Sequence, residues 1–149
     1  MNKNEGNTGS EKIYEILSFN LCGRDFAVDV DYVEMVIEKP NITFVPKARE
    51  FIKGVINLRG RIVTVVDLTK LLGIEMEKEN NNFKNVMILR VGDVEVGFLV
   101  DNVKEVIRAK ESDIDTQFGS VEYERKAKGV IKKGDKLVVY LDVEEILKT

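Results

Sequence analysis

The sequence contains no histidine, which removes the usual general base near neutral pH and the commonest side-chain ligand of transition metals. Catalysis would therefore depend on carboxylates, lysines or the single cysteine, Cys22. Cys22 lies in an expected turn beside Arg24, but a cysteine nucleophile normally needs a neighbouring base. We interpret Cys22 as an incidental thiol.

The carboxylates that stand out are Asp67 and Asp142, which follow two equivalent apolar strands. Two such groups could form an acid–base pair, but each also precedes a short helical pattern, and a helix N-cap explains both. The acidic cluster at 111–115 lacks the glycine and the distal glutamate of a calcium loop. The pattern from Gly54 to Gly60 lacks the lysine of a phosphate loop. We expect no catalytic residue, no metal and no cofactor.

The elements that position these side chains are short strands joined by tight turns. The sequence predicts a hairpin over 14–28, a short helix running into a strand over 30–38, and a second hairpin over 54–67 that turns at Arg59-Gly60. A short helix follows Asp67, and a polar linker follows at 75–85. Residues 1–12 are polar and predict a disordered tail.

The second half of the sequence repeats the first. VDYVEMVIE at 30–38 matches VDNVKEVIR at 100–108 with identity at five of nine positions, and 54–72 aligns with 129–147 without a gap. The repeat predicts an all-β protein with short helices, in which two lobes at about 13–75 and 84–149 each form a small barrel. Exchange of chain segments between the lobes is compatible with the pattern.

The core between the two lobes is expected to come from two nearly continuous apolar strands, IVTVVDL and LVVYLDV. Strands that are covered on both faces have this composition. The interpretation places four side chains near the junction of the lobes: Val63, Val65, Val138 and Tyr140.

The charge pattern excludes several classes of partner. The chain has 23 basic and 26 acidic residues, a net charge of −3, and no basic block of the kind that binds nucleic acid. The first residues have no apolar segment typical of a signal peptide, and no run approaches the roughly 20 apolar residues of a membrane span. One cysteine in 149 residues fits a reducing compartment. We expect a cytoplasmic protein that does not insert into membranes.

Arg59 is the residue that most suggests a binding surface. It lies at the tip of the first lobe's hairpin, in NLRG, whereas the equivalent hairpin reads KKGD and has no arginine. A long bidentate donor in one copy indicates a contact specific to that lobe. The alternative is a solvated turn residue.

The segment EFIKGVINLRGRIVTVVDL at 50–68 resembles the central signature of CheW-like domains, and FAVDVDYVEMVIE and VEVGFLVDNVKEVI resemble its companion segments. The resemblance covers roughly residues 13–148, and it departs from the family pattern at Thr64, where proline is frequent. It implies two SH3-like five-stranded barrels. It also implies a chemotaxis scaffold that couples the cytoplasmic tip of membrane chemoreceptors to the CheW-like regulatory domain of the histidine kinase CheA, recruited from the cytoplasm to receptor arrays.

The resemblance further implies particular contact residues. The receptor-binding surface would comprise Val33, Met35, Val36, Gly54, Leu58 and Arg59. Core packing is the alternative for the three apolar residues at 33–36. Phe118, an aromatic residue in a polar loop, would face the kinase, or else anchor that loop to its own barrel.

Two other functions remain open at this level. A CheW-like regulatory module of another two-component system would have the same fold, but such modules occur within kinases or beside receiver domains, and no receiver-sized segment follows here. A barrel that binds small molecules or carbohydrate normally presents aromatic platforms, whereas this chain has no tryptophan and 7% aromatic residues.

The interpretation of Cys22 is testable. Cys22→Ser should leave the coupling of receptors to the kinase unchanged, because nothing in the sequence equips this thiol for chemistry. A reconstituted kinase assay checks this. A folded variant that no longer supports coupling would contradict it.

Overall fold

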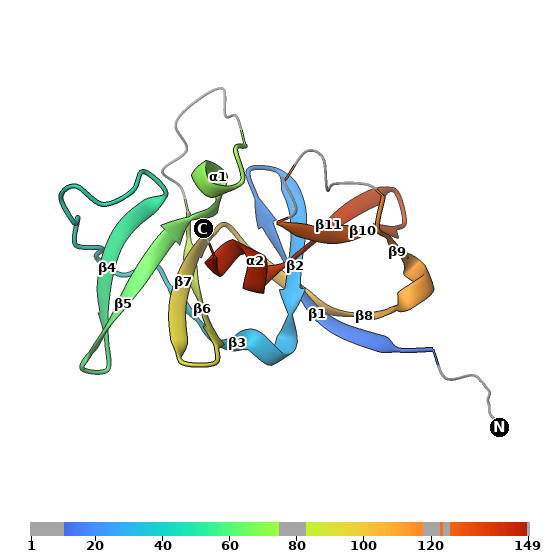
Figure 1. The fold of residues 1–149 in the computed structure, drawn as a ribbon, viewed down its shortest axis with the longest axis horizontal. Helices are drawn as coiled ribbons and strands as arrows, with labels where there is room; N and C mark the ends of the chain where they lie inside the picture. The colour runs from blue at the N-terminus through green and yellow to red at the C-terminus, as the bar shows by residue number, and fades with distance from the viewer. Residues whose placement is uncertain (1–10, 75–82, 118–122, 124–125, 149) are drawn as a thin grey trace.

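The computed structural model describes residues 11–74, 83–117, 123 and 126–148, and within them the strands form two sheets (Figure 1). One sheet has the order β3-β6-β7-β5-β4, with β3 (Val33–Glu38), β4 (Ile52–Leu58), β5 (Arg61–Asp67), β6 (Asn85–Val91) and β7 (Val94–Val100). The other has the order β8-β1-β2-β11-β10-β9, with β1 (Ile13–Leu21), β2 (Arg24–Asp29), β8 (Val103–Lys110), β9 (Ile114–Asp115), β10 (Ala127–Lys133) and β11 (Lys136–Leu141). The predicted all-β class with two SH3-like barrels is confirmed, although one sheet has six strands rather than five.

Each sheet takes one hairpin from the opposite half of the chain. The N-terminal hairpin β1–β2 pairs with β8 and, in parallel, with β11, while β6–β7 pairs with β3 and, in parallel, with β5. The ranges 13–75 and 84–149 therefore describe the two sequence repeats and not the two sheets. The exchange of segments that the repeat pattern permitted is the arrangement observed.

Tight turns end the strands where the sequence indicated. Arg59 and Gly60 join β4 to β5 with φ values of 52° and 85°, and Cys22 and Gly23 join β1 to β2 with φ values of 53° and 78°. Two consecutive residues at positive φ match the twist of a two-residue hairpin. Both turns thus place a residue other than glycine in the left-handed region.

The largest hydrophobic core draws side chains from both sheets. Phe19, Phe26 and Leu141 of the six-stranded sheet share one cluster with Met87 and Phe98 of the five-stranded sheet. Burial of a large apolar side chain contributes roughly 1.5–3 kcal/mol, so this shared cluster joins the sheets firmly.

The predicted junction residues divide between two clusters. Val63 and Val65 belong to the shared cluster, but Val138 and Tyr140 line a smaller, separate cluster within the six-stranded sheet. Their placement at the junction was wrong, because alternate residues of a strand face opposite sides even within a continuous apolar run. Leu141, the neighbour of Tyr140, is the residue that enters the shared cluster.

Short helices complete the fold: α1 (Leu68–Leu71), α2 (Val143–Leu147) and the 3-10 helices η1 (Val30–Tyr32) and η2 (Glu111–Asp113). The Asp67 side chain accepts a hydrogen bond from the Thr69 amide at 3.0 Å, and that of Asp142 accepts one from the Glu145 amide at 3.2 Å. The predicted N-caps are confirmed. Val143 and Ile146 insert α2 into the shared cluster, and Figure 1 shows α2 between the two sheets.

Two glycines permit equivalent close crossings in the two repeats. A Cβ atom on Gly54 would lie 2.2 Å from the Thr43 carbonyl oxygen, and one on Gly129 would lie 2.7 Å from that of Asp115. Gly54 and Gly129 occupy aligned positions of the repeat. The close approach is therefore a requirement of the fold in both copies.

Alanine substitutions test this requirement. Gly54→Ala and Gly129→Ala should each lower the free energy of unfolding by about 1–3 kcal/mol or more, because the new methyl group overlaps the backbone. Urea denaturation measures the loss. Gly134→Ala is the control, since no atom lies within 4 Å of its Cβ position and only a strained φ of 61° opposes the change. Gly129→Ala meets the overlap without a left-handed φ, so an unchanged free energy of unfolding for Gly129→Ala would contradict the account.

Candidate functional site

The residues expected to face the receptor lie on β3 and on the β4–β5 hairpin of the five-stranded sheet. On β3, Val33 and Met35 are partly buried and pack against the shared core, whereas Val36 points outward with 38% of its surface exposed. Val36 is the member of the three that is available for contact. The alternative of core packing describes Val33 and Met35 well.

Gly54 and Leu58 are mainly structural in the free protein. Leu58 is buried in the shared core with 8% exposure, and Gly54 is buried beneath Thr43. Their roles in receptor binding stay predictions. Packing within the fold explains both residues without such a role.

Arg59 is exposed at the hairpin tip. The turn beside it is held by the Asn57 side chain, whose Oδ1 accepts a hydrogen bond from the Gly60 amide at 3.0 Å. Within the described part of the chain, the Arg59 side chain has no hydrogen-bond or ion-pair partner. The aligned residue in the other repeat is Gly134, with φ of 61°, so Arg59 holds at 52° a conformation that glycine adopts without strain.

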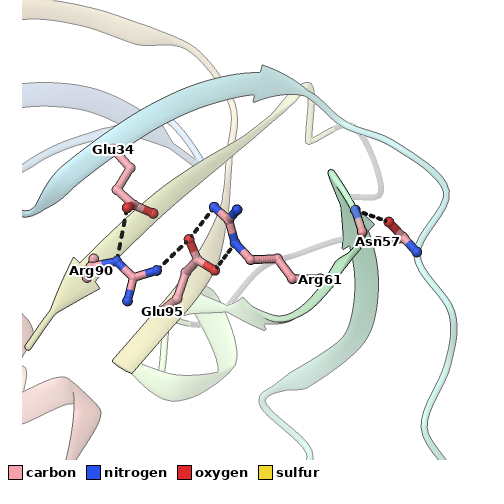
Figure 2. Close-up of polar contacts among 6 residues, drawn as sticks. Glu34, Asn57, Arg61, Arg90 and Glu95 are labelled. Carbon is pink, nitrogen blue, oxygen red and sulfur yellow. Dashed lines mark hydrogen bonds and ion pairs between the residues drawn. The ribbon is translucent and has the colours of Figure 1, made fainter. Parts of the chain in front are cut away.

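A chain of charged side chains connects β3 to this hairpin (Figure 2). The Arg61 guanidinium on β5 donates two hydrogen bonds to the Glu95 carboxylate on β7, at 2.7 and 2.8 Å. Arg90 on β6 lies 3.3 Å from the same carboxylate and donates to Glu34 on β3 at 3.0 Å. The charged chain crosses four adjacent strands, so it ties the edge strand β3 to the end of the hairpin next to its turn.

Glu95 is the centre of this chain. Its side chain is only 10% exposed and lies between two guanidinium groups. The paired hydrogen bonds from Arg61 are the main cause that lowers the pKa of Glu95 from 4.5 to about 2. Bidentate arginine–carboxylate pairs fix direction as well as distance, so Glu95 orients both arginines.

Comparison with known proteins identifies the family of this chain. A family model described as the CheW-like domain matches residues 15–149. The chain is 47% identical over 137 residues to the chemotaxis protein CheW of Thermotoga maritima, which covers 92% of this chain and 89% of that protein. It is 30% identical to the chemotaxis protein CheW of Helicobacter pylori, covering 93% and 84% of the two chains.

A solved structure agrees with these matches. The scaffolding protein TtCheW from Thermoanaerobacter tengcongensis has a TM-score of 0.80 and 28% sequence identity with this chain, covering 93% of it and 94% of that chain. The chain belongs to the CheW-like family. As a member of the CheW-like family it is a chemotaxis coupling scaffold.

The remaining sequence-based predictions for this CheW-like chain concern Phe118, Cys22, metal binding and membrane insertion. Phe118 lies outside the described residues. Cys22 is half-buried, and its amide donates to the Asp101 side chain at 2.9 Å, as part of the β1–β2 turn. In the described ranges, no group of three or more potential ligand residues is arranged to hold a metal ion. The same ranges contain no helix with the length and apolar character needed to cross a membrane.

Sequence reasoning missed several exposed apolar residues. Ile62 on β5 is 65% exposed and Val106 on β8 is 51% exposed, while Phe44, in the segment between β3 and β4, is 74% exposed. The repeat carried a signal for two of them, because Val106 aligns with Val36 and Ile62 aligns with the equally exposed Leu137. Exposed apolar side chains at paired positions indicate contact surfaces.

The charged chain predicts a dependence of stability on pH. Because the pKa of Glu95 is lower in the folded protein, the unfolded chain takes up the proton first as the pH falls. The contribution of Glu95 is complete above pH 4.5 and is lost as the pH falls towards about 2. Glu95→Gln should therefore flatten the decline in stability across this range.

Urea denaturation of both proteins at a series of pH values measures this. Glu50→Gln removes an exposed carboxylate outside the charged chain and serves as the control. Parallel pH profiles for the wild type and Glu95→Gln would show that the charged chain contributes nothing to the fold.

Proposed function

We propose that this chain binds the cytoplasmic tip of chemoreceptors through β3 and the β4–β5 hairpin, and binds the regulatory domain of the histidine kinase CheA through a separate surface. It works in the cytoplasm at receptor arrays and catalyses no reaction itself. The proposal follows from membership of the CheW-like family, whose matched members are chemotaxis and scaffolding proteins.

Arg59 is the observation that carries the receptor-binding part of the proposal. It adopts a left-handed conformation that the other repeat gives to a glycine, and strain of this kind costs about 1–3 kcal/mol. Cys22 has a similar φ in the β1–β2 turn, so the support for binding comes from the exposed Arg59 side chain and not from the strain alone. An exposed guanidinium without a partner in the described chain is ready to bind a carboxylate or a carbonyl of the receptor.

The charged chain supports the same surface. Arg61 continues directly from the hairpin turn and is fixed by Glu95, and Glu34 lies on β3 between Val33 and Met35. The two parts of the receptor surface are thereby held at a constant separation. A preorganised surface loses less entropy on binding, which favours affinity without new contacts.

The kinase-binding part rests on Phe118 and on the family resemblance. A second, independent surface is needed because a coupling protein must hold both partners at once. The six-stranded sheet can supply this second surface, because the proposed receptor surface on β3 and the β4–β5 hairpin lies only on the five-stranded sheet. The protein then changes kinase activity by fixing where the receptor and the kinase lie.

Substitutions of Arg59 test the receptor contact. Arg59→Ala should change the free energy of unfolding by no more than about 0.5 kcal/mol, since alanine meets the same backbone strain and the side chain leaves the core untouched. Arg59→Gly should leave it unchanged or raise it by about 1 kcal/mol. Both variants should lose about 2 kcal/mol of receptor binding, roughly a thirtyfold loss of affinity.

Titration of a receptor fragment, and separately of the kinase regulatory domain, measures the two effects. Lys133→Ala, near the turn of the equivalent hairpin, is the control, and its ion pair with Glu105 lies in the other sheet. Similar losses for Arg59→Ala and Lys133→Ala, or an unfolded Arg59→Gly protein, would mean that Arg59 serves the fold and not the receptor.

A further inference from the structure

The charged chain of the five-stranded sheet has a counterpart in the six-stranded sheet. At its centre, Asp25 on β2 corresponds to Glu95 on β7. Each carboxylate lies opposite one residue of the preceding strand, which is Asn20 for Asp25 and Arg90 for Glu95. The Asn20 amide donates a hydrogen bond to the Asp25 carboxylate at 3.3 Å, but it carries no charge. A neutral amide therefore replaces one of the two guanidinium groups.

The other two members of the counterpart are both lysines. Lys136 occupies the position aligned with Arg61, and Lys104 occupies the position aligned with Glu34. Lys104 lies 3.2 Å from the Asp25 carboxylate. Two arginines and two glutamates balance each other in the five-stranded sheet, whereas the counterpart has two lysines and one aspartate. The counterpart therefore carries one positive charge that its own members do not neutralise.

A cleft of about 220 Å³ opens at this counterpart. Asp25, Lys104 and Lys136 line the cleft, together with Lys133 and Glu105. Lys133 and Glu105 form an ion pair, but their side chains are 51% and 53% exposed. An exposed ion pair contributes little to stability, so Lys133 can exchange Glu105 for another anion. Three ammonium groups and two carboxylates thus line a cleft that is open to solvent.

A second cleft, of about 350 Å³, adjoins the first. The two clefts share Ile107 and Lys133, and the second is also lined by Lys132, Arg108 and Asp113. Arg108 is exposed, and in the described part of the chain its side chain has no hydrogen bond or ion pair. Five basic and three acidic side chains therefore line the two clefts, in a chain whose net charge is −3. This local excess of positive charge favours an anionic ligand.

We propose that the two adjoining clefts bind a small anion with two linked phosphate groups, one phosphate in each cleft. Lysines bind phosphate as point charges, and the Arg108 guanidinium can bind two phosphate oxygens at once. The first cleft is smaller than the roughly 300 Å³ at which pockets for drug-sized ligands begin, so it fits a phosphate and not a nucleoside. Lys133 lines both clefts and would contact both phosphates. The proposal does not depend on receptor or kinase binding.

Titration of the isotope-labelled full chain with pyrophosphate, followed by amide NMR, tests the proposal. The ionic strength is kept low because salt screens exposed charges. Shifts should be largest for residues that line the clefts on β8, β10 and β11. Lys104→Glu gives this sheet the carboxylate that Glu34 supplies in the other, and should weaken pyrophosphate binding about tenfold or more. Lys84→Glu makes the same charge change at an exposed position outside both clefts and should have no such effect.

Arg108→Gln tests the second cleft by itself. It should weaken pyrophosphate binding about tenfold and leave the affinity for inorganic phosphate unchanged, because a single phosphate occupies the first cleft. ADP distinguishes two sources of the same diphosphate chemistry. ADP that binds as tightly as pyrophosphate would indicate the diphosphate of a nucleotide, and weaker binding of ADP would indicate a free diphosphate.

Thermal melting checks that each variant is folded, and Lys104→Gln removes the charge without placing a carboxylate beside Asp25. Shifts spread evenly over the lysines of the chain, or equal losses for Lys104→Glu and Lys84→Glu, would overturn the proposal. Equal affinities for pyrophosphate and for succinate, a dicarboxylate, would also overturn it, because the clefts would then attract any anion. An Arg108→Gln protein with unchanged affinity for pyrophosphate would exclude the second phosphate position.

Discussion

The N-terminal hairpin pairs with strands from the far end of the chain, and this pairing holds the two sheets in one body. β1 and β2 lie between β8 and β11, while β6 and β7 lie between β3 and β5. Neither sequence repeat can complete its own sheet, so each sheet depends on a hairpin from the other repeat. The shared core of Phe19, Phe26, Met87, Phe98 and Leu141 then fixes the sheets relative to one another. This fixed arrangement is the property on which the proposed coupling of receptor and kinase by position depends.

The candidate binding surface is built on that rigid frame. Four strands, from the turn end of the hairpin to the edge of the sheet, are connected by Arg61, Glu95, Arg90 and Glu34. The lowered pKa of Glu95 keeps its carboxylate charged at acidic pH values where an ordinary glutamate would be protonated, so the connection persists below pH 4.5. Arg59 lies in the turn beside Arg61 and has a strained backbone, and the lobe without an arginine has a glycine at that position. The two hairpins differ at this turn, and the difference supports the proposed role of Arg59 in binding.

Short sequence motifs and the internal repeat predicted much of this fold. Glycines and the residues beside them marked the hairpin turns, Asp67 and Asp142 marked the helix caps, and the repeat indicated two equivalent barrels. The exchange of hairpins was not fixed by the sequence pattern, because pairing between β2 and β11 joins residues more than a hundred positions apart. The sequence pattern did not predict the charged chain either, because Arg61 and Glu95 are 34 positions apart. Tyr140 was placed on the wrong side of its strand because an apolar run does not reveal which residues face which core.

The central claim is that the chain links receptor to kinase by position and without chemistry of its own. The most direct measurement is the autophosphorylation rate of CheA, reconstituted with receptor-containing vesicles and with or without this chain. The account predicts that receptor control of the kinase appears only when all three components are present, and that the chain alone leaves the basal rate unchanged. Receptor control that is equally strong without the chain, or a chain that alters the kinase in the absence of receptors, would contradict it.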